Sequence, residues 1–366
     1  MGKDPLTGKY TQISRTFHGG ARAADEALRN LIDEQAPVPA DGRRVTVGQL
    51  LNRLLDECER LELSPTTLRN YRSQIELRIR PELGKIMITD LSAKHLDDLY
   101  RRMKSADLSA KTIRNCHAIL SSALHQAARW GWVRENIAER AKPPRLSQRR
   151  VQVPSVETVR LIIETAETRD PRLAPLLMLG ALTGLRRGEL CALRWTDVHL
   201  DEGTLDVARS IIVVAGGVAE KSTKSDRERS VALDQVAVLL LAQHRSSVDD
   251  WAKQAETAIP EEAFVFSPLV DGSGPFRPDN VTGFFVRVRD ELGLKGVRLH
   301  DLRHFTATQL IGANVDIRTV AGRLGHSDPS LTLRVYSHVI EERDRTAAEI
   351  MGQVLGPTPK KAELHT

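Results

Sequence analysis

The sequence predicts a mainly α-helical protein with a small antiparallel β-sheet, which is an α+β fold. Apolar residues recur at helical spacing through 45–140, whereas the runs 205–214 and 229–233 are strand-like. The segment 141–151 between these parts carries two prolines and predicts an extended linker. With 366 residues and 41% hydrophobic content, the chain can build two or three packed cores.

The first 40 residues open with a turn-rich stretch and continue with a strand-like one. Ile13, Arg15 and Phe17 alternate with polar neighbours, and a helix is expected over 21–32. Proline and glycine then mark 35–42 as a linker. We therefore expect a small sheet-and-helix unit in 1–40.

Four helices are expected between 45 and 140. Their signals are apolar spacing over 47–61, Ser64 followed by Pro65, the Asp-Leu-Ser of 90–92, and Ser109 as an N-cap. The fourth helix carries one apolar stripe and an opposite polar side, which is typical of a helix with one face on a core. Residues 152–350 predict a second, mostly helical domain that contains the strand-like runs. A final helix is expected over 340–355. The C-terminal tail is expected over 351–366, and its part from 357 onward is polar.

Charge is unevenly distributed along the chain. The net charge is +5 and the pI is about 9.2. Residues 1–150 hold 27 Lys and Arg against 18 Asp and Glu, a net +9, whereas the remaining residues hold 26 against 30, a net −4. A basic surface attracts phosphate backbones with a salt-dependent affinity, so we expect the first half to meet nucleic acid.

Several classes of protein are excluded by what the sequence lacks. The cysteines, Cys58, Cys116 and Cys191, are far apart and without paired spacing, so they predict neither a disulfide framework nor a zinc site. No stretch approaches the ~20 apolar residues of a membrane span, and the polar N-terminus lacks the apolar core of a signal peptide. We therefore expect a soluble protein of the reducing cytoplasm, with no membrane partner.

Four motifs place cationic and proton-transferring groups in a fixed order. They are Thr183-Gly-Leu-Arg186-Arg-Gly-Glu189-Leu, His300-Asp-Leu-Arg303-His304, Leu324-Gly-His326, and Tyr336 followed by His338. Phosphoryl transfer needs fixed cations at the non-bridging oxygens, with a nucleophile and a leaving-group acid on opposite sides. Arginine suits the first task because its fork stays charged and grips two oxygens. The motifs therefore predict a site that breaks and rejoins a phosphodiester.

Each residue alone also has a simpler explanation. A tyrosine in an apolar stretch is usually a core residue, an isolated histidine is usually structural, and Arg186 beside Arg187 would usually be a solvated helix face. These explanations treat each residue separately, and they do not account for the occurrence of all of the residues in the order that one chemistry requires. His304 and His338 we still interpret as structural support.

The order of these groups resembles that of the tyrosine recombinases, which include the phage integrases, and the resemblance spans about residues 45–350. It implies a helical core-binding domain over 45–140, followed by a mixed catalytic domain over 152–350. It also implies that a tyrosine attacks a DNA phosphate, forms a 3′-phosphotyrosine link and releases a 5′-hydroxyl. The reaction requires no cofactor, and no metal site is expected.

The resemblance assigns a role to each motif residue. Tyr336 is the nucleophile, Arg186 and Arg303 hold the scissile phosphate, His300 and His326 contact phosphate oxygens or assist proton transfer, and Glu189 supports the site. A phenol has a pKa of about 10, so it needs nearby positive charge or a base to attack at neutral pH. The family uses a hairpin lysine as the general acid for the 5′-oxygen. Both Lys221 and Lys224 are candidates, and we favour Lys224, which lies seven residues before Val231.

DNA contacts are expected in both N-terminal parts. Similar helical domains clamp one face of DNA, and the residues that we expect to face the duplex are Arg69, Arg72, Lys111, Arg114 and Asn115. Residues 1–40 resemble the latter part of the arm-site DNA-binding domain of phage-type integrases, so we expect a partial domain of that kind.

The function expected from these motifs is site-specific recombination that integrates or excises a mobile element. The expected assembly is a homotetramer on two double-stranded DNA sites, and the resemblance leaves room for host DNA-bending or excision factors. Two alternatives remain open at this point: type IB topoisomerase-like relaxation, and a DNA-binding protein without catalysis.

Overall fold

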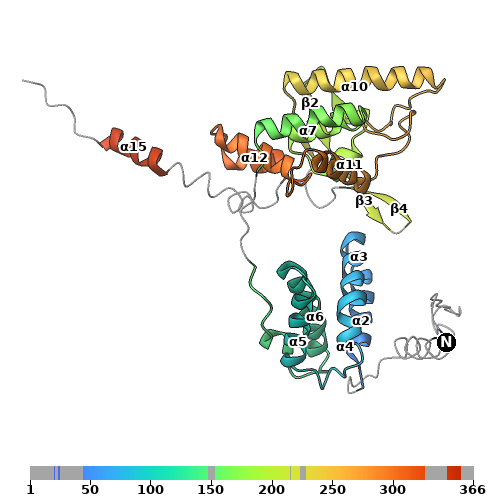
Figure 1. Ribbon diagram of the computed structural model, residues 1–366, viewed down its shortest axis with the longest axis vertical. Helices are drawn as coiled ribbons and strands as arrows, with labels where there is room; N and C mark the ends of the chain where they lie inside the picture. Colours follow the sequence, from blue (N-terminus) through green and yellow to red (C-terminus); the bar gives the residue numbers. More distant parts are fainter. Residues whose placement is uncertain are drawn as a thin grey trace, which may run out of the picture. The chain divides into compact units, whose positions relative to one another are not determined.

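The computed structural model describes residues 20, 24, 44–146, 153–214, 216–222, 228–325 and 344–355. The chain forms two compact units, Met1–Gln148 and Arg149–Thr366 (Figure 1). The prediction of a mainly helical chain with little antiparallel sheet is confirmed. The expected strand at Ile13 and Phe17 and the expected helix over 21–32 lie outside the described residues, apart from Ala24.

The first unit is a helical domain. Its elements are α2 (Val47–Arg60), α3 (Pro65–Gln74), η1 (Ile75–Ile79), α4 (Arg80–Leu83), α5 (Ala93–Ser105), α6 (Ala110–Arg129) and the 3-10 turn η2 (Ile137–Arg140). The predicted N-caps are confirmed at Ser64 and Ser109, whose hydroxyls accept from the backbone N–H groups of Thr67 and Thr112. The apolar stripe of α6 is buried in the core of this unit.

A π-helical segment, which the sequence did not indicate, follows α3 after Gln74. The π-helical segment η1 carries the chain into α4, and the Arg80 N–H donates to the Ile75 carbonyl five residues back. Pro81, which lacks an N–H, lies in the first turn of α4. A wider turn before a proline removes the need for one regular helical hydrogen bond.

The second unit combines helices with two small sheets. Its helices are α7 (Val156–Arg169), α8 (Ala174–Thr183), α9 (Arg187–Ala192), η3 (Trp195–Asp197), α10 (Gln235–Gln254), α11 (Pro278–Glu291), α12 (Asp301–Gly312), α13 (Ile317–Leu324) and α15 (Asp344–Leu355). Helix α8 is apolar nearly all round and lies in the core with Leu176, Leu177 and Leu179 fully buried. The final helix is confirmed from residue 344, and 340–343 lie outside the described residues.

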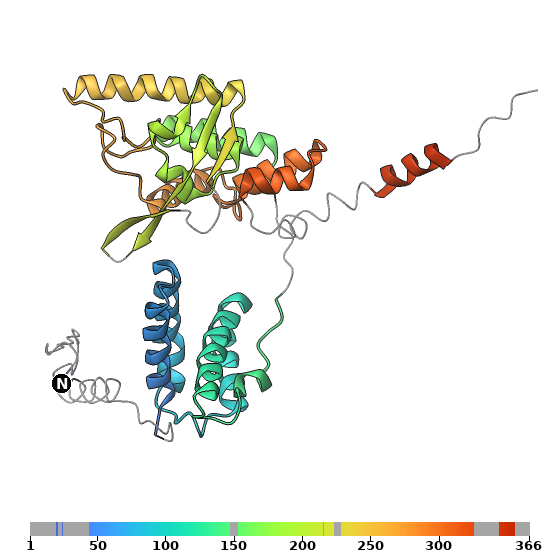
Figure 2. The same ribbon diagram turned by 180° about the vertical axis from the view of Figure 1, so that it is seen from behind.

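The predicted run 205–214 is two strands of different sheets. Strand β2 (Thr204–Val207) pairs antiparallel with β1 (Val198–His199) and β5 (Arg229–Ala232), whereas β3 (Arg209–Val214) pairs with β4 (Gly217–Ser222). Both views show the β3–β4 hairpin projecting from the body of this unit, with α7 and α10 on the other side (Figures 1 and 2). Separate pairing partners on the two sides of Ala208 explain why one strand-like run became two strands.

Two further facts concern the cysteines and the length of the helices. Cys58, Cys116 and Cys191 are free thiols, and all three are buried. None of the helices within the described ranges has the length and apolar character that a membrane span requires.

Candidate active site

The site begins at the turn that joins α8 to α9. Helix α8 ends at Gly184, whose φ of +71° is left-handed, and a Cβ there would lie 2.5 Å from Leu324 Cδ2. The chain then extends through Arg186, which is the N-cap of α9. The Gly184 carbonyl accepts a hydrogen bond of 2.7 Å from Arg303 Nη1. One turn therefore positions both arginines that were predicted to hold phosphate.

Arg303 comes to this turn from α12. This helix packs on α8, where the Thr306 hydroxyl donates to the Ala181 carbonyl at 2.7 Å. Arg303 itself is only 3% exposed. His300 is the N-cap of α12 and has helical dihedrals, so it lies at the helix entrance, one turn before Arg303. Asp301, 2% exposed, holds this entrance because its carboxylate accepts from the backbone and guanidinium of Arg298.

Glu189 is the buried carboxylate of the site, at 3% exposure. Its Oε1 accepts from Arg186 Nη1 at 2.8 Å, and its Oε2 accepts from the Arg186 backbone N–H at 2.8 Å. Arg229 adds a fork, with Nη1 to Oε1 at 3.2 Å and Nη2 to Oε2 at 2.8 Å. Burial alone would raise the pKa of Glu189, but the hydrogen bonds and charges of Arg229 and Arg186 hold that pKa below its usual value.

Arg186 has one further anchor, at the end of α13. Its Nη2 donates to the Gly325 carbonyl at 2.6 Å, and Gly325 directly precedes the predicted His326. The Arg186 side chain stays 43% exposed, so it is fixed from one side and accessible from the other. His326, Tyr336 and Lys224 lie outside the described residues, whereas Lys221 is exposed on β4. The described part of the chain therefore brings together Arg186, Glu189, His300 and Arg303.

A cleft of about 570 Å³ lies over this cluster. Among the described residues that line it, every charged side chain is an arginine: Arg186, Arg187, Arg298 and Arg303. The rest of the lining includes His300, Ser210, Thr282 and apolar residues of α8. Cations gathered in a concave surface raise the local concentration of anions, which suits a phosphodiester.

His300 is held neutral in this environment. Partial desolvation of the ring beside the cleft, followed by the charges of His304 and Arg303, lowers the pKa of His300 to about 4. The pKa of His304 is also lowered, mainly by burial, and the two rings meet edge to face with centroids 4.9 Å apart. A neutral imidazole can both donate and accept a hydrogen bond, so His300 can assist proton transfer without adding charge.

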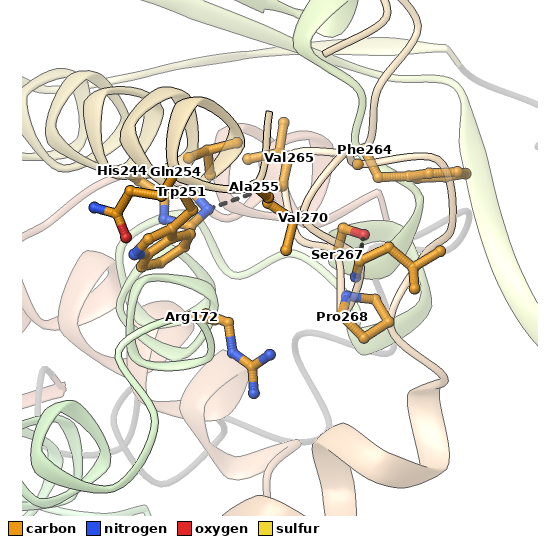
Figure 3. A pocket seen from close by; sticks show the side chains of 13 residues that line it. Arg172, His244, Trp251, Gln254, Ala255, Phe264, Val265, Ser267, Pro268 and Val270 are labelled. Atoms are coloured by element: carbon orange, nitrogen blue, oxygen red, sulfur yellow. Dashed lines mark hydrogen bonds between the residues drawn. The ribbon is translucent and has the colours of Figure 1, made fainter. Parts of the chain in front are cut away.

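A second cavity of about 370 Å³ lies between the end of α10 and the loop 264–272 (Figure 3). His244, Trp251 and Arg172 line it, and none of the predicted catalytic residues does. His244 is 4% exposed, and its Nε2–H donates to the Val265 carbonyl at 2.8 Å, drawn as a dashed line. Burial lowers the pKa of His244, which fits a structural histidine that ties α10 to this loop.

The predicted DNA-contact residues lie on two helices of the first unit. Arg69 and Arg72 are exposed on α3, whereas Lys111, Arg114 and Asn115 share the polar side of α6. Arg72 is engaged in an ion pair with Glu59 of α2. Arg114 donates to the Pro144 carbonyl at 3.4 Å, so it lies against the start of the predicted linker.

Three arginines of this region were missed by sequence reasoning: Arg187, Arg229 and Arg298. Arg187 was given no role, but it lines the cleft and bonds to Thr282 of α11. Arg298 precedes the His300 motif by two residues and binds Asp301. Arg229 stands in a run of mixed charges, and no local pattern distinguishes it from a surface residue.

Comparison with known proteins extends these observations to most of the chain. Residues 155–343 match the model of the Phage integrase family, and residues 46–104 match the phage integrase N-terminal SAM-like domain. A tyrosine recombinase XerC-like protein of Caldanaerobacter subterraneus subsp. tengcongensis is 24% identical over 93% of this chain and 92% of its own length. The ICEBs1 integrase of Bacillus subtilis is 22% identical over 97% of this chain and 96% of its own length.

Solved structures show the same fold. The Tn1549 transposon integrase in complex with a circular intermediate DNA matches with a TM-score of 0.70 at 19% identity, over 82% of this chain and 99% of that one. The lambda integrase in a tetramer bound to a Holliday junction matches with a TM-score of 0.63 at 21% identity, over 91% of this chain and 90% of that one. Since one family model covers more than half of the sequence, the chain belongs to the phage integrase family and is a tyrosine-type site-specific DNA recombinase.

Proposed function

We propose that this recombinase cleaves and rejoins DNA through a 3′-phosphotyrosine intermediate and so integrates or excises a mobile element. The observation that carries the proposal is the anchoring of Arg186 and Arg303 on one turn beneath a cleft whose charged lining is cationic. Two fixed guanidinium groups can neutralise the charge that spreads over the non-bridging oxygens of a phosphate under attack.

The proposed cleavage step is a transesterification. The Tyr336 phenolate attacks phosphorus, the bond to the 5′-oxygen breaks, and Lys224 or Lys221 supplies the proton that makes the 5′-hydroxyl. His300 and His326 contact phosphate oxygens or take part in proton transfer. Glu189 acts by holding Arg186. A second 5′-hydroxyl reverses the step, so the energy of the phosphodiester is kept and no cofactor is needed.

The partner that we propose is double-stranded DNA, with Arg69, Arg72, Lys111, Arg114 and Asn115 touching its backbone. We propose further that four copies assemble on two sites in the cytoplasm. The lambda integrase structure, a tetramer on a Holliday junction, supports that stoichiometry by its likeness in fold. Host DNA-bending or excision factors would join the assembly.

The two alternatives are less well supported. Type IB topoisomerase-like relaxation and DNA binding without catalysis both fit single motifs, but the relatives that match over nearly the whole chain are named as a tyrosine recombinase and an integrase. A pure DNA-binding protein also has no need of two arginines anchored beneath a cleft.

The test is a suicide-substrate assay in EDTA with a pool of nicked duplexes that covers the ends of the element. Wild type should give a denaturation-resistant band on a 3′ end, and Tyr336→Phe should lose the band yet bind DNA with nearly unchanged affinity, because only one hydroxyl is removed. Tyr71→Phe, a phenol of the first unit, is the matched control and should keep the band. Tight binding without a band in wild type would overturn the proposal.

A further inference from the structure

Arg229 is the first residue of β5 and has no role in the chemistry described above. Its side chain is only 11% exposed, and its guanidinium makes three hydrogen bonds. Two form the fork on Glu189, and the third runs from Nε to the Arg323 carbonyl at 3.0 Å. A buried cation with this many fixed partners lies in one conformation, since each bond removes a rotameric freedom.

The fork on Glu189 connects Arg229 to Arg186, one of the two arginines that we propose hold the phosphate. Each Glu189 oxygen accepts one bond from Arg229 and one from Arg186. A carboxylate with all of its acceptor directions in use has a fixed plane, and that plane sets the direction of the Arg186 side chain. Without Arg229, Glu189 would lose two of these bonds and could rotate, and the cleft side of Arg186 would move with it.

The third bond reaches the segment that leads to His326. The last turn of α13 lies against Arg229, since a Cβ on Gly325 would lie 2.7 Å from Arg229 Nη1 and 2.9 Å from Cζ. Arg229 holds the Arg323 carbonyl, and Arg186 holds the Gly325 carbonyl two residues later. The end of α13 is therefore fixed between two arginines that share Glu189.

We propose that Arg229 is a positioning residue of the recombinase, which sets the orientation of Arg186 through Glu189 and fixes the end of α13 beside it. The inference rests on the proposed cleavage function. Arg229 does not touch the phosphate in this account. It joins α9, β5 and α13, three segments from distant parts of the sequence, at one carboxylate.

The experiment is a double-mutant cycle on the full chain. Arg229→Gln, Arg186→Lys and the double variant are compared with wild type in single-turnover cleavage of the nicked duplex, at protein concentrations that saturate the DNA. Arg229→Gln should slow formation of the covalent link about 100-fold, because misplacement of the Arg186 guanidinium should cost about that factor. DNA affinity should change less than about twofold. In the Arg186→Lys background the same change should slow cleavage less than about threefold further, because the group that Arg229 orients is already gone.

A matched control separates positioning from general loss of structure. Arg209→Gln removes a half-buried arginine of β3 that pairs with Asp197 and does not touch the Glu189 cluster, so its cleavage rate should stay within about threefold of wild type. If Arg229→Gln does not fold, Arg229→Lys is measured in its place. That variant keeps the charge but not the fork, and it should cleave about tenfold more slowly than wild type.

Two results would overturn the inference. One is a wild-type cleavage rate in Arg229→Gln, or in Arg229→Lys where the first variant does not fold. The other is a loss in the double variant equal to the product of the single losses, which would make Arg229 a purely structural residue. Failure of the proposed function looks different, since wild type itself would then form no covalent link.

Discussion

Replacing Glu189 by Gln tests whether this buried carboxylate stabilises the second unit through its bonds to Arg186 and Arg229. The change keeps the shape of the side chain but turns one acceptor oxygen into an NH₂ group. Each oxygen accepts two hydrogen bonds, so the new NH₂ would face two N–H donors whichever way the amide is turned. Arg229, 11% exposed, would also lose its counter-charge.

The expected cost follows from this geometry. Removing one partner of a buried ion pair costs about 3 to 5 kcal/mol. Arg186 is 43% exposed and can regain water, so the lower end applies, and we expect Glu189→Gln to reduce the free energy of unfolding by about 3 kcal/mol at pH 7. Glu291→Gln is the matched control, because its pair with Arg169 is exposed and its loss should leave stability unchanged within error.

The same variant has a defined pH dependence. The pKa of Glu189 in the folded chain lies below the ordinary value, so its contribution is fully present above about pH 4.5 and is lost as the pH falls through the folded-state pKa. The stability gap between wild type and Glu189→Gln should therefore narrow below about pH 4.5 in urea titrations followed by circular dichroism. Equal stabilities at pH 7, or a gap that widens in acid, would refute the reasoning.

Three other predictions address packing, titration and DNA contact. Gly188→Ala places a Cβ 2.7 Å from the Ile211 carbonyl oxygen and should lower the free energy of unfolding by about 1 to 3 kcal/mol in urea denaturation. Gly322→Ala, whose Cβ would have no atom within 4 Å, should raise it by up to about 1 kcal/mol, and equal effects of the two changes would contradict the contact at Gly188. In DNA-free protein, the His300 ring should remain neutral by NMR until about pH 4. Since this pKa lies below the ordinary 6.5, stability should fall from pH 6.5 toward 4 less steeply in His300→Asn, and a midpoint near 6.5 would count against the desolvation of this ring. Lys111→Ala should reduce the slope of log affinity against log salt by about 1 without changing sequence preference, and an altered preference would mean that Lys111 reads bases.

The sequence could locate the parts of the site that one chemistry requires in a fixed order. Arg186, His300 and Arg303 come from motifs more than 100 residues apart, yet they line one cleft. Helix starts were also predictable. A serine before a proline or an apolar run caps the helix that follows it, and this local hydrogen bond does not depend on contacts with distant residues. Lys224, His326 and Tyr336 remain predictions.

What the sequence could not indicate depends on contacts between distant residues. Arg229 stands among mixed charges in the sequence, and its burial follows from Glu189 forty residues earlier. The split of 205–214 at Ala208 follows from which strand each half meets, and both halves have the same strand-like composition. The N-cap position of His300 follows from Asp301, which turns back to hold Arg298.

The two arginines that we propose hold the phosphate are anchored in the same way. Arg303 donates to the carbonyl of Gly184 and Arg186 donates to the carbonyl of Gly325, and each glycine ends a helix with a left-handed φ. The C-terminal end of a helix carries partial negative charge on carbonyls that lack a helical partner, so these carbonyls stabilise a guanidinium bound there, in addition to the Glu189 carboxylate that Arg186 also binds. A carboxylate in the cleft would repel phosphate, whereas a backbone carbonyl holds the arginine and leaves its positive charge available. At both positions a Cβ would collide with a neighbour, Leu324 at one and Arg229 at the other, so glycine is required where the two arginines are anchored.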